Sequence, residues 1–485
     1  MLAGRMRVSS TTSSPADTGA DTLAVGVFDG KGIAHDVEDG SLQRLLDSGE
    51  ARTAFRHLAV IHAAGHRWLL VGLGARDDFT PERARIAAAT AHGRALELGT
   101  TRLCWELPHH VDDAVTGAFV EGTVLAGYRF DRYKSAMGED RRIEELIVSA
   151  HDDVSGPVDA AAVVAEAVNA ARDLQNTPAN DMTPAALADV ARGLEGVEVE
   201  VHGRDFLLER GMGAFAAVAQ GGHNEPALIV LRYDGADARG PVLGLVGKAV
   251  TFDTGGISIK PAAKMHEMKF DMSGGAAVVA AVGAIARLGL PVRVIGVVGA
   301  TENMPSGHAM RPGDIVTASN GTTIEINNTD AEGRLVLGDC ITHAIALGAE
   351  RLVDIATLTG GIVTALGSAF AGVMSNDDDW CAEVEAAGAR TGERVWRLPL
   401  DPMYDDASKG QYGDIMNATT DRKAHPITAA AFLARFAGDV PWAHVDMAGV
   451  MNDLGLPYAA KGGSGFGVRL LVDVARGVAN GTRPG

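Results

Sequence analysis

The sequence predicts a two-domain α/β protein. A helix joins an N-terminal α/β domain to a larger C-terminal α/β domain, which has a mixed, mainly parallel central sheet flanked by helices. The length of 485 residues exceeds what one compact core usually contains. Strand-like apolar runs alternate with helical patterns, which is typical of parallel sheets. Gly reaches 60 residues while aromatics make up only 5%, a composition that suits tight turns between strands and helices.

The N-terminal elements follow from short apolar runs. Residues 1–20 are rich in Ser and Thr, and we expect them to form a mobile tail. Residues 21–155 are predicted to form the first α/β domain, with strands at Leu23–Phe28, Ala59–Ala63 and Trp68–Gly72 and a helix at Pro81–Leu98. An Ala-rich helix over 160–174 ends near Asn176-Thr-Pro-Ala-Asn180. We therefore expect a connecting helix and linker over residues 156–180.

The remaining residues, 181–485, form the predicted C-terminal domain. Strands and helices alternate there, with strands at Val242–Val250, Val292–Ala300 and Leu352–Thr357 and helices at Ser273–Leu288 and Glu332–Leu347. Ligands bind beyond the carboxyl ends of strands in such sheets. Lys248 and Asp253, the turn at Glu302 and the turn at Thr357 all lie near predicted strand ends. We expect the functional site at that edge.

Composition and charge exclude several classes of protein. Hydrophobic residues make up 46% of the chain, which excludes global disorder. No uncharged apolar run reaches the roughly 18 residues of a transmembrane helix, and the N-terminus lacks a signal-peptide core. The cysteines, Cys104, Cys340 and Cys381, lack metal-site spacing, so we expect a cytoplasmic protein without disulfides. A net charge of −19 argues against general nucleic-acid binding.

Four carboxylates lie at strand ends or helix starts: Asp253, Asp271, Asp330 and Glu332. Singly, each is more typical of a helix cap, because a carboxylate accepts hydrogen bonds from the first N–H groups. Together, at one edge of a parallel sheet, they would repel one another and take up protons unless cations neutralised them. Two divalent ions would balance the four charges. Oxygen ligands suit Zn²⁺, Mn²⁺ or Mg²⁺ and do not choose among them.

Two lysines and an arginine accompany the acids. Lys248 follows an apolar run, where a solvated side chain would be unusual. A phosphate-binding P-loop is excluded, because Val242 and Ala249 occupy positions that the motif reserves for Gly and Ser or Thr. A neutral lysine amine can ligate a metal if nearby cations lower its pKa. Lys260 has the simpler alternative of a solvated surface charge, while Arg334 could clamp an anion.

Other catalytic patterns are incomplete. His266-Glu267 begins a zinc-helix motif, but Phe270 stands where its second His is needed. Gly72-Leu-Gly74 lacks the third Gly of a dinucleotide fingerprint, and no serine has the flanking glycines of a nucleophile elbow. The fifteen histidines show no ligand-like pairing, and we interpret most of them as surface or core residues.

The segment Asn328-Thr-Asp-Ala-Glu-Gly-Arg-Leu335 matches the signature of the leucine (cytosol) aminopeptidase family at every position. The Lys248–Lys260 segment and Asp271-Met272 resemble the other metal-site motifs of that family at the right spacing. Similarity covers about residues 160–480, while the N-terminal domain matches loosely at Leu70-Val-Gly-Leu-Gly74. The chain thus resembles a dinuclear metal-dependent aminopeptidase, and residues 181–485 would be its metallopeptidase catalytic domain.

The resemblance implies a role for each matching residue. Asp253 and Glu332 would bridge two divalent metal ions, with Asp330 completing the first site and Lys248 and Asp271 the second. The metals would be Mn²⁺ or Zn²⁺, with Mg²⁺ or Co²⁺ as alternatives. Lys260 and Arg334 match the two catalytic positions that are not primary ligands. The positions that match the substrate pocket are Met268, Asn328, Ala331, Thr357, Leu358 and Gly360.

The implied reaction is hydrolysis of the first peptide bond of a peptide with a free N-terminus. A metal-bridging water would be the nucleophile, and Lys260 would stabilise the oxyanion. A bicarbonate ion held by Arg334 would act as general base. We expect a preference for Leu- or Met-type first residues, as in a leucyl aminopeptidase. One departure is Ala424-His425-Pro426, which replaces a Gly-rich approach to Ile427 and leaves the local loop and the side-chain preference open.

The resemblance also implies a homohexamer made of two trimers, without a membrane partner. Two alternative functions are open. A DNA-binding regulatory role would require a basic groove, but residues 1–150 contain more acidic than basic residues. A dipeptidase specialised for Cys-Gly would use the same site.

Overall fold

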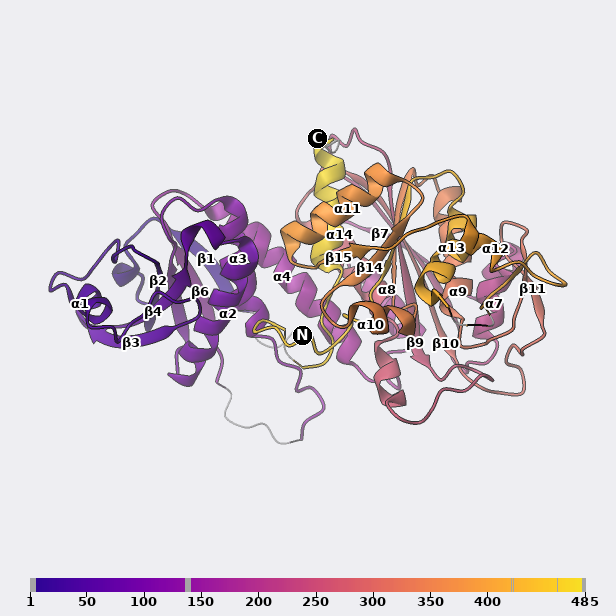
Figure 1. The fold of residues 1–485 in the computed structure, drawn as a ribbon, viewed down its shortest axis with the longest axis horizontal. Helices are drawn as coiled ribbons and strands as arrows, with labels where there is room; N and C mark the ends of the chain where they lie inside the picture. The colour runs from indigo at the N-terminus through magenta and orange to yellow at the C-terminus, as the bar shows by residue number, and fades with distance from the viewer. Residues whose placement is uncertain (1–5, 136–140, 420, 422, 460, 482–485) are drawn as a thin grey trace. The chain divides into compact units, whose positions relative to one another are not determined.

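The structure, a computed structural model, describes residues 6–135, 141–419, 421, 423–459 and 461–481. The chain divides into two compact units, and the division falls inside helix α4 (Ser155–Asn176). Residues up to Asn169, with a short segment that begins at Gly455, form the first unit. Ala170 and most of the later residues form the second unit, and Figure 1 shows both α/β units. The fold is therefore the two-domain α/β architecture that the sequence predicts.

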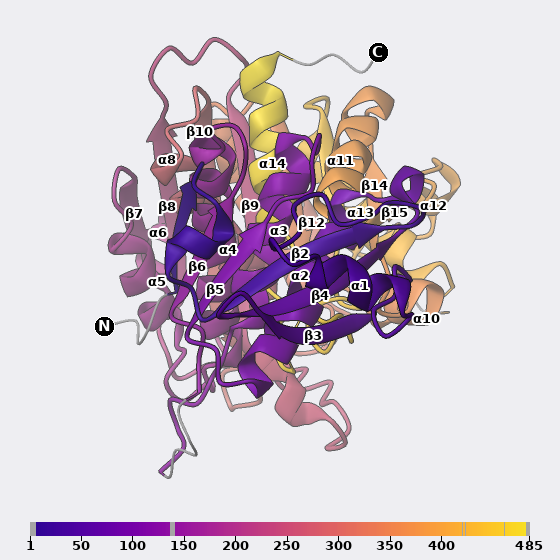
Figure 2. The ribbon, with the colours of Figure 1, turned by 90° about the vertical axis from the view of Figure 1, so that its left-hand side faces the viewer.

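The first unit contains a six-stranded sheet in the order β1-β6-β5-β2-β4-β3. Its strands are β1 (Arg7–Thr11), β2 (Thr22–Phe28), β3 (Leu58–Ala63), β4 (His66–Gly74), β5 (Arg102–Glu106) and β6 (Glu145–Ser149). All neighbours are parallel except β3 and β4. Figure 2 shows β2, β4 and β3 side by side. The helices are α1 (Ser41–Asp47), α2 (Pro81–Glu97) and α3 (Asp113–Ala126), with short 3-10 turns η1 (Pro15–Thr18) and η2 (Arg76–Asp78).

The prediction that residues 1–20 form a mobile tail is wrong for residues 7–11, which form a strand. Arg7–Thr11 forms strand β1, which pairs in parallel with β6 from Arg7 opposite Glu145 to Thr11 opposite Ser149. Thr and Val favour extended backbone, and an edge strand tolerates hydroxyl side chains because one of its sides faces solvent. Composition suggested a tail because the strand is polar. Residues 1–5 lie outside the described residues.

The second unit is built on an eight-stranded sheet in the order β15-β14-β17-β13-β9-β10-β8-β7. The strands are β7 (Glu198–His202), β8 (Ala227–Asp234), β9 (Leu243–Asp253), β10 (Arg293–Asn303), β13 (Arg351–Ala356), β14 (Ala371–Ser375), β15 (Val395–Arg397) and β17 (Trp442–Asp446). The central strands β17, β13, β9 and β10 are parallel, whereas β14, β8 and β7 each run antiparallel to a neighbour. The predicted mixed, mainly parallel sheet is confirmed.

Helices cover both faces of this sheet (Figure 1). Successive residues of a strand point to opposite faces, and β10 shows the consequence: the Val298 side chain lies against α8, while Gly299 lies beneath Val336 and Cys340 of α9. The helices are α5 (Pro184–Arg192), α6 (Arg204–Glu209), α7 (Gly213–Ala219), η3 (Met265–Phe270), α8 (Ser273–Arg287), α9 (Gly333–Ala346), α10 (Gly360–Leu366), α11 (Asp378–Thr391), α12 (Met403–Asp406), α13 (His425–Ala437) and α14 (Val468–Asn480). A small sheet joins β11 (Ile315–Thr317), β12 (Thr323–Glu325) and β16 (Ile415–Met416).

The segment Met265–Arg287 is long and apolar enough to cross a membrane by composition alone. However, 89% of its apolar window is buried inside the structure. Its α8 part packs so closely on the sheet that a Cβ atom added at Gly274 would lie 2.1 Å from the carbonyl oxygen of Ile355. Only glycine allows this approach. The segment is therefore a core helix, and its apolar composition reflects burial between strands and neighbouring helices.

The buried His92 of α2 makes the stability of the first unit pH-dependent. Its side chain is 4% exposed, its Nδ1 atom has no hydrogen-bond partner among the described residues, and burial lowers its pKa to about 4. Between pH 6.5 and about 4 the unfolded chain therefore binds a proton that the folded chain does not. The free energy of unfolding should fall as the pH falls through this window, by about 3 kcal/mol in total.

Urea unfolding monitored at several pH values tests this prediction. His92→Leu should have a visibly shallower loss of stability with acid than the wild type, because it removes the titrating group. His62→Leu is the matched control, since His62 is exposed on β3, and it should retain the wild-type slope. Parallel pH profiles for all three proteins would contradict the assignment.

Candidate metal centre

The predicted site residues gather where neighbouring parallel strands of the second unit end. The strands lie in the order β17-β13-β9-β10, so their carboxyl ends form one edge of the sheet. Each end carries a polar residue: Asp446 on β17, Thr357 after β13, Asp253 on β9 and Asn303 on β10. Helix α9 begins at the same edge, because Glu332, directly before its first residue, contacts Lys248 of β9. Side chains from distant segments thus meet in one place.

Three carboxylates form the centre of the group. Asp253, Asp330 and Glu332 each offer an oxygen atom, and these oxygens lie within 4.8 Å of one another. Asp253 and Glu332 are buried, while Asp330 is partly exposed. Asp271, which directly follows η3, is buried beside them and reaches the group through Lys248. The structure therefore brings together all four acids that the sequence singled out.

Lys248 lies buried among these acids. Its Nζ atom is 2.9 Å from a carboxylate oxygen of Asp271, 2.8 Å from Oε1 of Glu332 and 3.0 Å from the carbonyl oxygen of Thr357. Its side chain lies directly against the start of α9, because a Cβ atom added at Gly333 would come within 2.8 Å of Nζ. Gly333 therefore leaves the space that Lys248 needs to reach Glu332.

Lys260 occupies the other side of the carboxylate group. Its Nζ atom lies 2.8 Å from Oδ2 of Asp253 and also forms an ion pair with Asp330. Burial alone would lower its pKa, but Asp253, Glu332 and Asp330 outweigh burial and raise it. Lys260 is thus held as an ammonium ion, and it is not the solvated surface charge that the simpler interpretation suggested.

The electrostatics show an excess of negative charge. Burial raises the pKa of Asp271, and the neighbouring Asp253 and Glu332 raise it further, although Lys248 opposes the change. Burial and the same kind of crowding raise the pKa of Asp330. Glu332 differs: burial would raise its pKa, but Lys248 and Lys260 lower it. Two ammonium groups cannot fully offset four crowded carboxylates, so the oxygen-rich set fits divalent cations.

Asn303 organises the carboxylates, and sequence reasoning did not single it out. Its Nδ2 donates to Oδ1 of Asp253 at 2.8 Å, to the carbonyl oxygen of Thr329 at 3.1 Å and to Oε2 of Glu332 at 3.4 Å. One amide therefore links the strand-end acid to the helix-start acid. Its place at the end of a buried strand, directly after Glu302, was the available signal.

The turn after β9 closes around the same group. Gly255 has φ of 86°, and a Cβ atom there would lie 2.6 Å from the carbonyl oxygen of Ser258 and 2.9 Å from Asp330. Thr329 ties the turn to the helix start, because its hydroxyl donates to the Gly255 carbonyl at 2.6 Å. Glycine is therefore required at position 255 by both its backbone angle and its contacts.

Arg334 lies two residues after Glu332, in the first turn of α9. It is 2% exposed, and its Nε atom has no hydrogen-bond partner among the described residues. Burial lowers its pKa to about 10, opposed by Glu332 and Asp446, so it stays a cation at neutral pH. Its Nη2 atom lies 3.4 Å from Nε2 of His425, the first residue of α13. A buried cation with an unpaired N–H group fits a small anion.

A second buried network supports this side of the site. Asp446 accepts hydrogen bonds from the Leu358 backbone at 3.1 Å and from the Thr359 hydroxyl at 2.7 Å, and so fixes the turn after β13. Sequence reasoning missed Asp446, although, like Asp253, it is an acid at the end of an apolar strand. Asp354 similarly binds Nδ1 of His444 at 2.6 Å.

The predicted substrate-pocket residues lie around the group in different settings. Thr357 is buried, and its hydroxyl donates to Asp271 at 2.6 Å. The Asn328 side chain accepts from the Asp330 backbone at 2.9 Å. The others lie as follows: Ala331 is buried, Met268 is half-buried on η3, Leu358 is half-buried after β13, and Gly360 is exposed at the start of α10.

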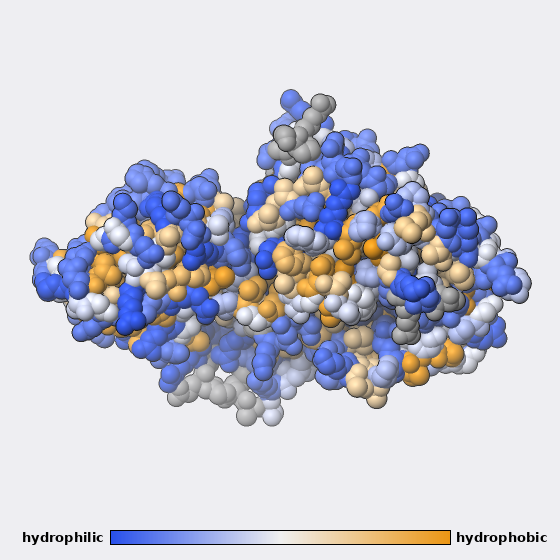
Figure 3. All heavy atoms as spheres, viewed as in Figure 1, coloured by the Kyte–Doolittle hydropathy of each residue, from blue (hydrophilic) through white to orange (hydrophobic). Residues whose placement is uncertain are grey.

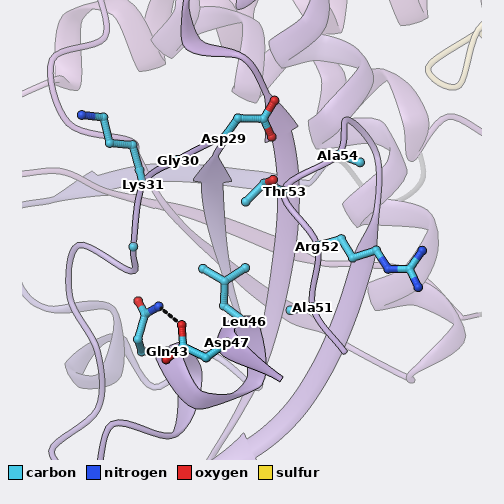
Figure 4. Close-up of a pocket in the computed structure, with 11 residues that line it drawn as sticks. Asp29, Gly30, Lys31, Gln43, Leu46, Asp47, Ala51, Arg52, Thr53 and Ala54 are labelled. Carbon is cyan, nitrogen blue, oxygen red and sulfur yellow. Dashed lines mark hydrogen bonds between the residues drawn. The ribbon is translucent and has the colours of Figure 1, made fainter. Parts of the chain in front are cut away.

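An open hollow of about 640 Å³ lies in the first unit (Figure 4). Lys31 and Arg52 point away from one another there, and Gln43 donates to Asp47 at 2.8 Å. Its titratable side chains do not converge as those of the second unit do. We therefore place the chemistry at the buried carboxylates.

Comparisons with known proteins point to one family. Residues 169–472 match the catalytic domain of the cytosol aminopeptidase family, and residues 24–137 match its N-terminal domain. The probable cytosol aminopeptidase of Roseiflexus castenholzii is 42% identical, and the alignment covers 97% of this chain and 99% of that protein. Its counterpart from Solibacter usitatus is 43% identical over 94% and 96%. The solved structure of the bottromycin maturation enzyme BotP in complex with Mn is 36% identical, with a TM-score of 0.86, and covers 95% of this chain and 100% of that chain.

Replacing Asn303 tests its role in ordering the carboxylates. Asn303→Ala removes the amide that joins Asp253 and Glu332, so divalent metal affinity should fall about 10- to 100-fold in a metal titration. Asn376→Ala is the matched control, because its amide donates to the carbonyl oxygens of Gly438 and Val440, both at 3.0 Å. Equal metal affinity in the two variants would show that Asn303 does not position the ligands.

Proposed function

The chain belongs to the cytosol aminopeptidase family, whose members are metal-dependent aminopeptidases, and we propose that it removes Leu- or Met-type residues from the N-terminus of peptides. The observation that carries this proposal is the convergence of Asp253, Asp330 and Glu332 within 4.8 Å beside two buried or half-buried lysines. A cluster of this kind suits two cations, and with them hydrolysis at a carbonyl carbon.

Two overlapping sets of ligands support a two-metal site. Asp253, Asp330 and Glu332 would hold one ion. Lys248 and Asp271, together with Asp253 and Glu332, would hold the other, since Lys248 already contacts both Asp271 and Glu332. We propose Mn²⁺ or Zn²⁺, with Mg²⁺ or Co²⁺ as alternatives. Such ions, when bound, polarise a carbonyl oxygen and make water acidic enough to act as a nucleophile near neutral pH.

Lys248 must lose a proton to become a ligand. Burial alone would lower its pKa, but the surrounding Asp271, Glu332 and Asp253 outweigh burial and raise it. Cations placed among the same carboxylates would reverse that balance. We therefore expect loading with metal to release protons.

Lys260 is the residue that we propose for stabilising the oxyanion. It remains an ammonium ion between Asp253 and Asp330 and is 22% exposed at its side chain, so it can face a substrate while it stays anchored to two ligands. A preorganised cation next to a developing negative charge lowers the barrier without reorganisation at the moment of reaction.

Arg334 is the residue that we propose for holding bicarbonate. Its charge, its burial and its unpaired Nε atom support an anion at this position, and His425 lies beside it. Bicarbonate would supply a proton acceptor. The Ala424-His425-Pro426 segment thus has a structural consequence, because it opens α13 and places an imidazole next to the guanidinium.

The preference for apolar first residues rests on a small set of side chains. Met268 and Leu358 are half-buried apolar residues near the acids, while Gly360 and Ala331 leave space. A panel of aminoacyl amides, together with the dipeptide Cys-Gly, tests this preference. Rates on Leu and Met substrates should exceed those on charged residues, and a much faster rate on Cys-Gly would favour the dipeptidase alternative.

We also propose a cytoplasmic homohexamer built as a dimer of trimers. The three cysteines are free and buried, which suits a reducing compartment such as the cytoplasm.

The surface of the second unit supports the assembly. Several large apolar side chains of this unit are exposed, among them Trp396, Met403 and Tyr412, and Figure 3 shows apolar side chains around α10 and β15. Exposed apolar surface of this kind is common where subunits meet. Light scattering should give about six times the chain mass of 50.3 kDa, whereas a monomer would contradict the assembly.

Substitution of the acids and of Lys260 should separate metal binding from transition-state stabilisation. Glu332→Ala should lose both bound metal and hydrolysis of leucine amide, because it removes a shared ligand. Lys260→Met should lower kcat about 10²- to 10³-fold while retaining metal, as loss of one oxyanion donor does. Asp314→Ala, which removes a partly exposed acid that pairs with Arg311, should change neither. Full activity in Glu332→Ala would refute the proposed site.

Substitution of Arg334 should remove the response to bicarbonate. In the wild type, added bicarbonate should raise kcat, and in Arg334→Ala the rate should be low and independent of bicarbonate. Loss of a positioned base typically costs about 10²- to 10⁴-fold, which sets the upper limit of the effect. Arg311→Ala, which removes an exposed arginine, should respond as the wild type does. A full bicarbonate response in Arg334→Ala would overturn the assignment.

A further inference from the structure

A second cluster of ligand-type side chains lies in the first unit, far along the chain from the acids. His35, His109 and His151 each offer a ring nitrogen, and these atoms lie within 4.8 Å of one another. The expectation that the histidines show no ligand-like pairing is therefore wrong for these three. It failed because they come from three separate loops, so no short sequence spacing links them.

The topology explains why the three histidines meet. His35 lies in the loop after β2, His109 in the loop after β5 and His151 in the loop after β6. Strands β6, β5 and β2 are adjacent and parallel, so these loops leave the sheet at the same edge. Ligand sites in open α/β sheets form at this edge.

The distances fit a metal site. The Nε2 atoms of His109 and His151 are 3.0 Å apart, and the ring centroids of the three residues are separated by 4.4 to 4.9 Å. In a tetrahedral zinc site with Zn–N distances of about 2.0–2.1 Å, two ligand atoms lie about 3.3–3.4 Å apart. To reach this spacing, the His109–His151 pair would separate by a few tenths of an ångström, and nitrogens that lie up to 4.8 Å apart would move closer together.

Glu106 supplies the second observation. Its Oε1 atom lies 2.5 Å from Nδ1 of His35, which engages that nitrogen and leaves Nε2 as the ligand atom of the ring. Its other oxygen, Oε2, is buried and has no hydrogen-bond partner among the described residues. A carboxylate that orients a ligating histidine through its far nitrogen is a common feature of metal sites.

The loop that carries His109 is held in place. Arg76 donates to the carbonyl oxygen of His109 at 2.5 Å and to that of His110 at 3.1 Å. His110 itself has φ of 56°, a left-handed conformation that is costly for a residue other than glycine. Two observations thus indicate a fixed loop that presents His109 to the other imidazoles.

We propose that His35, His109 and His151 bind one divalent transition-metal ion, with Zn²⁺ as the probe, and that Glu106 orients His35 for this purpose. Three imidazole ligands favour Zn²⁺, Ni²⁺ or Cu²⁺ over Mg²⁺ and Mn²⁺. The site differs in chemistry from the oxygen-rich acids of the second unit. It does not depend on the proposed peptidase function.

Zinc stoichiometry of the full-length protein tests the proposal. After dialysis against micromolar Zn²⁺, the wild type should contain one more zinc ion per chain than His109→Gln/His151→Gln, as measured by mass spectrometry of the metal content. His62→Gln is the matched control, because His62 is exposed on β3 in the same unit, and it should bind as much zinc as the wild type. Equal zinc content in the wild type and the double variant would overturn the proposal.

Two further measurements keep the test decisive. Glu106→Gln retains the three imidazoles and should weaken the extra zinc ion about 10- to 100-fold without abolishing it. Circular dichroism verifies that each variant is folded, and His35→Gln alone replaces the double variant if that protein is unfolded. Cu²⁺ added to the wild type should show nitrogen couplings from several imidazoles in electron paramagnetic resonance, and these should be absent from the double variant. Oxygen-only coordination in the wild type would contradict the site.

Discussion

The second unit is organised by the need to hold four carboxylates together at one edge of a parallel sheet. Asp253 and Asp271 are buried, as is Glu332, and buried carboxylates are stable only when their charge is compensated. Lys248 and Lys260 supply part of that compensation from two sides. Because each lysine contacts two acids, removal of either lysine leaves a buried carboxylate without its ion pair. The site therefore stands as a unit, and the close packing around it follows from that requirement.

The surrounding backbone shows how the fold meets this requirement. Gly333 leaves space for the side chain of Lys248, Gly255 allows the turn that brings Lys260 back to Asp253, and Asn303 bridges the strand end to the helix start. An α/β sheet without a cluster of buried charges would need none of these three features. Beside the acids they form one continuous set of contacts, in which a change at one position displaces charges at the next.

Much of this was predictable from the sequence, and the rest was not for identifiable reasons. Asp253 and Asp330 could be placed because apolar runs mark strands and helices, and parallel strands share a carboxyl edge. Asn303 escaped notice because a lone amide carries no charge and no motif spacing. Strand β1 was missed because its residues are polar and its pairing partner, β6, lies more than a hundred residues away. The histidine cluster was missed for the same reason: only the folded sheet brings three loops together.

Both units use the same topological rule with different donor chemistry. The adjacent parallel strands of the first unit end in loops that carry imidazoles, and those of the second end in carboxylates with lysines. Carboxylates and neutral imidazoles select cations by different means. Carboxylates are hard oxygen ligands that neutralise the charge of the cation, whereas imidazoles donate a nitrogen electron pair and leave the net charge unchanged. The net charge of −19 does not by itself distinguish the two sites, because the selectivity of each site for a cation depends on the ligand atoms at its edge of the sheet. The edge of the sheet thus determines where ligands bind, and the side chains that follow each strand determine which ligands those are.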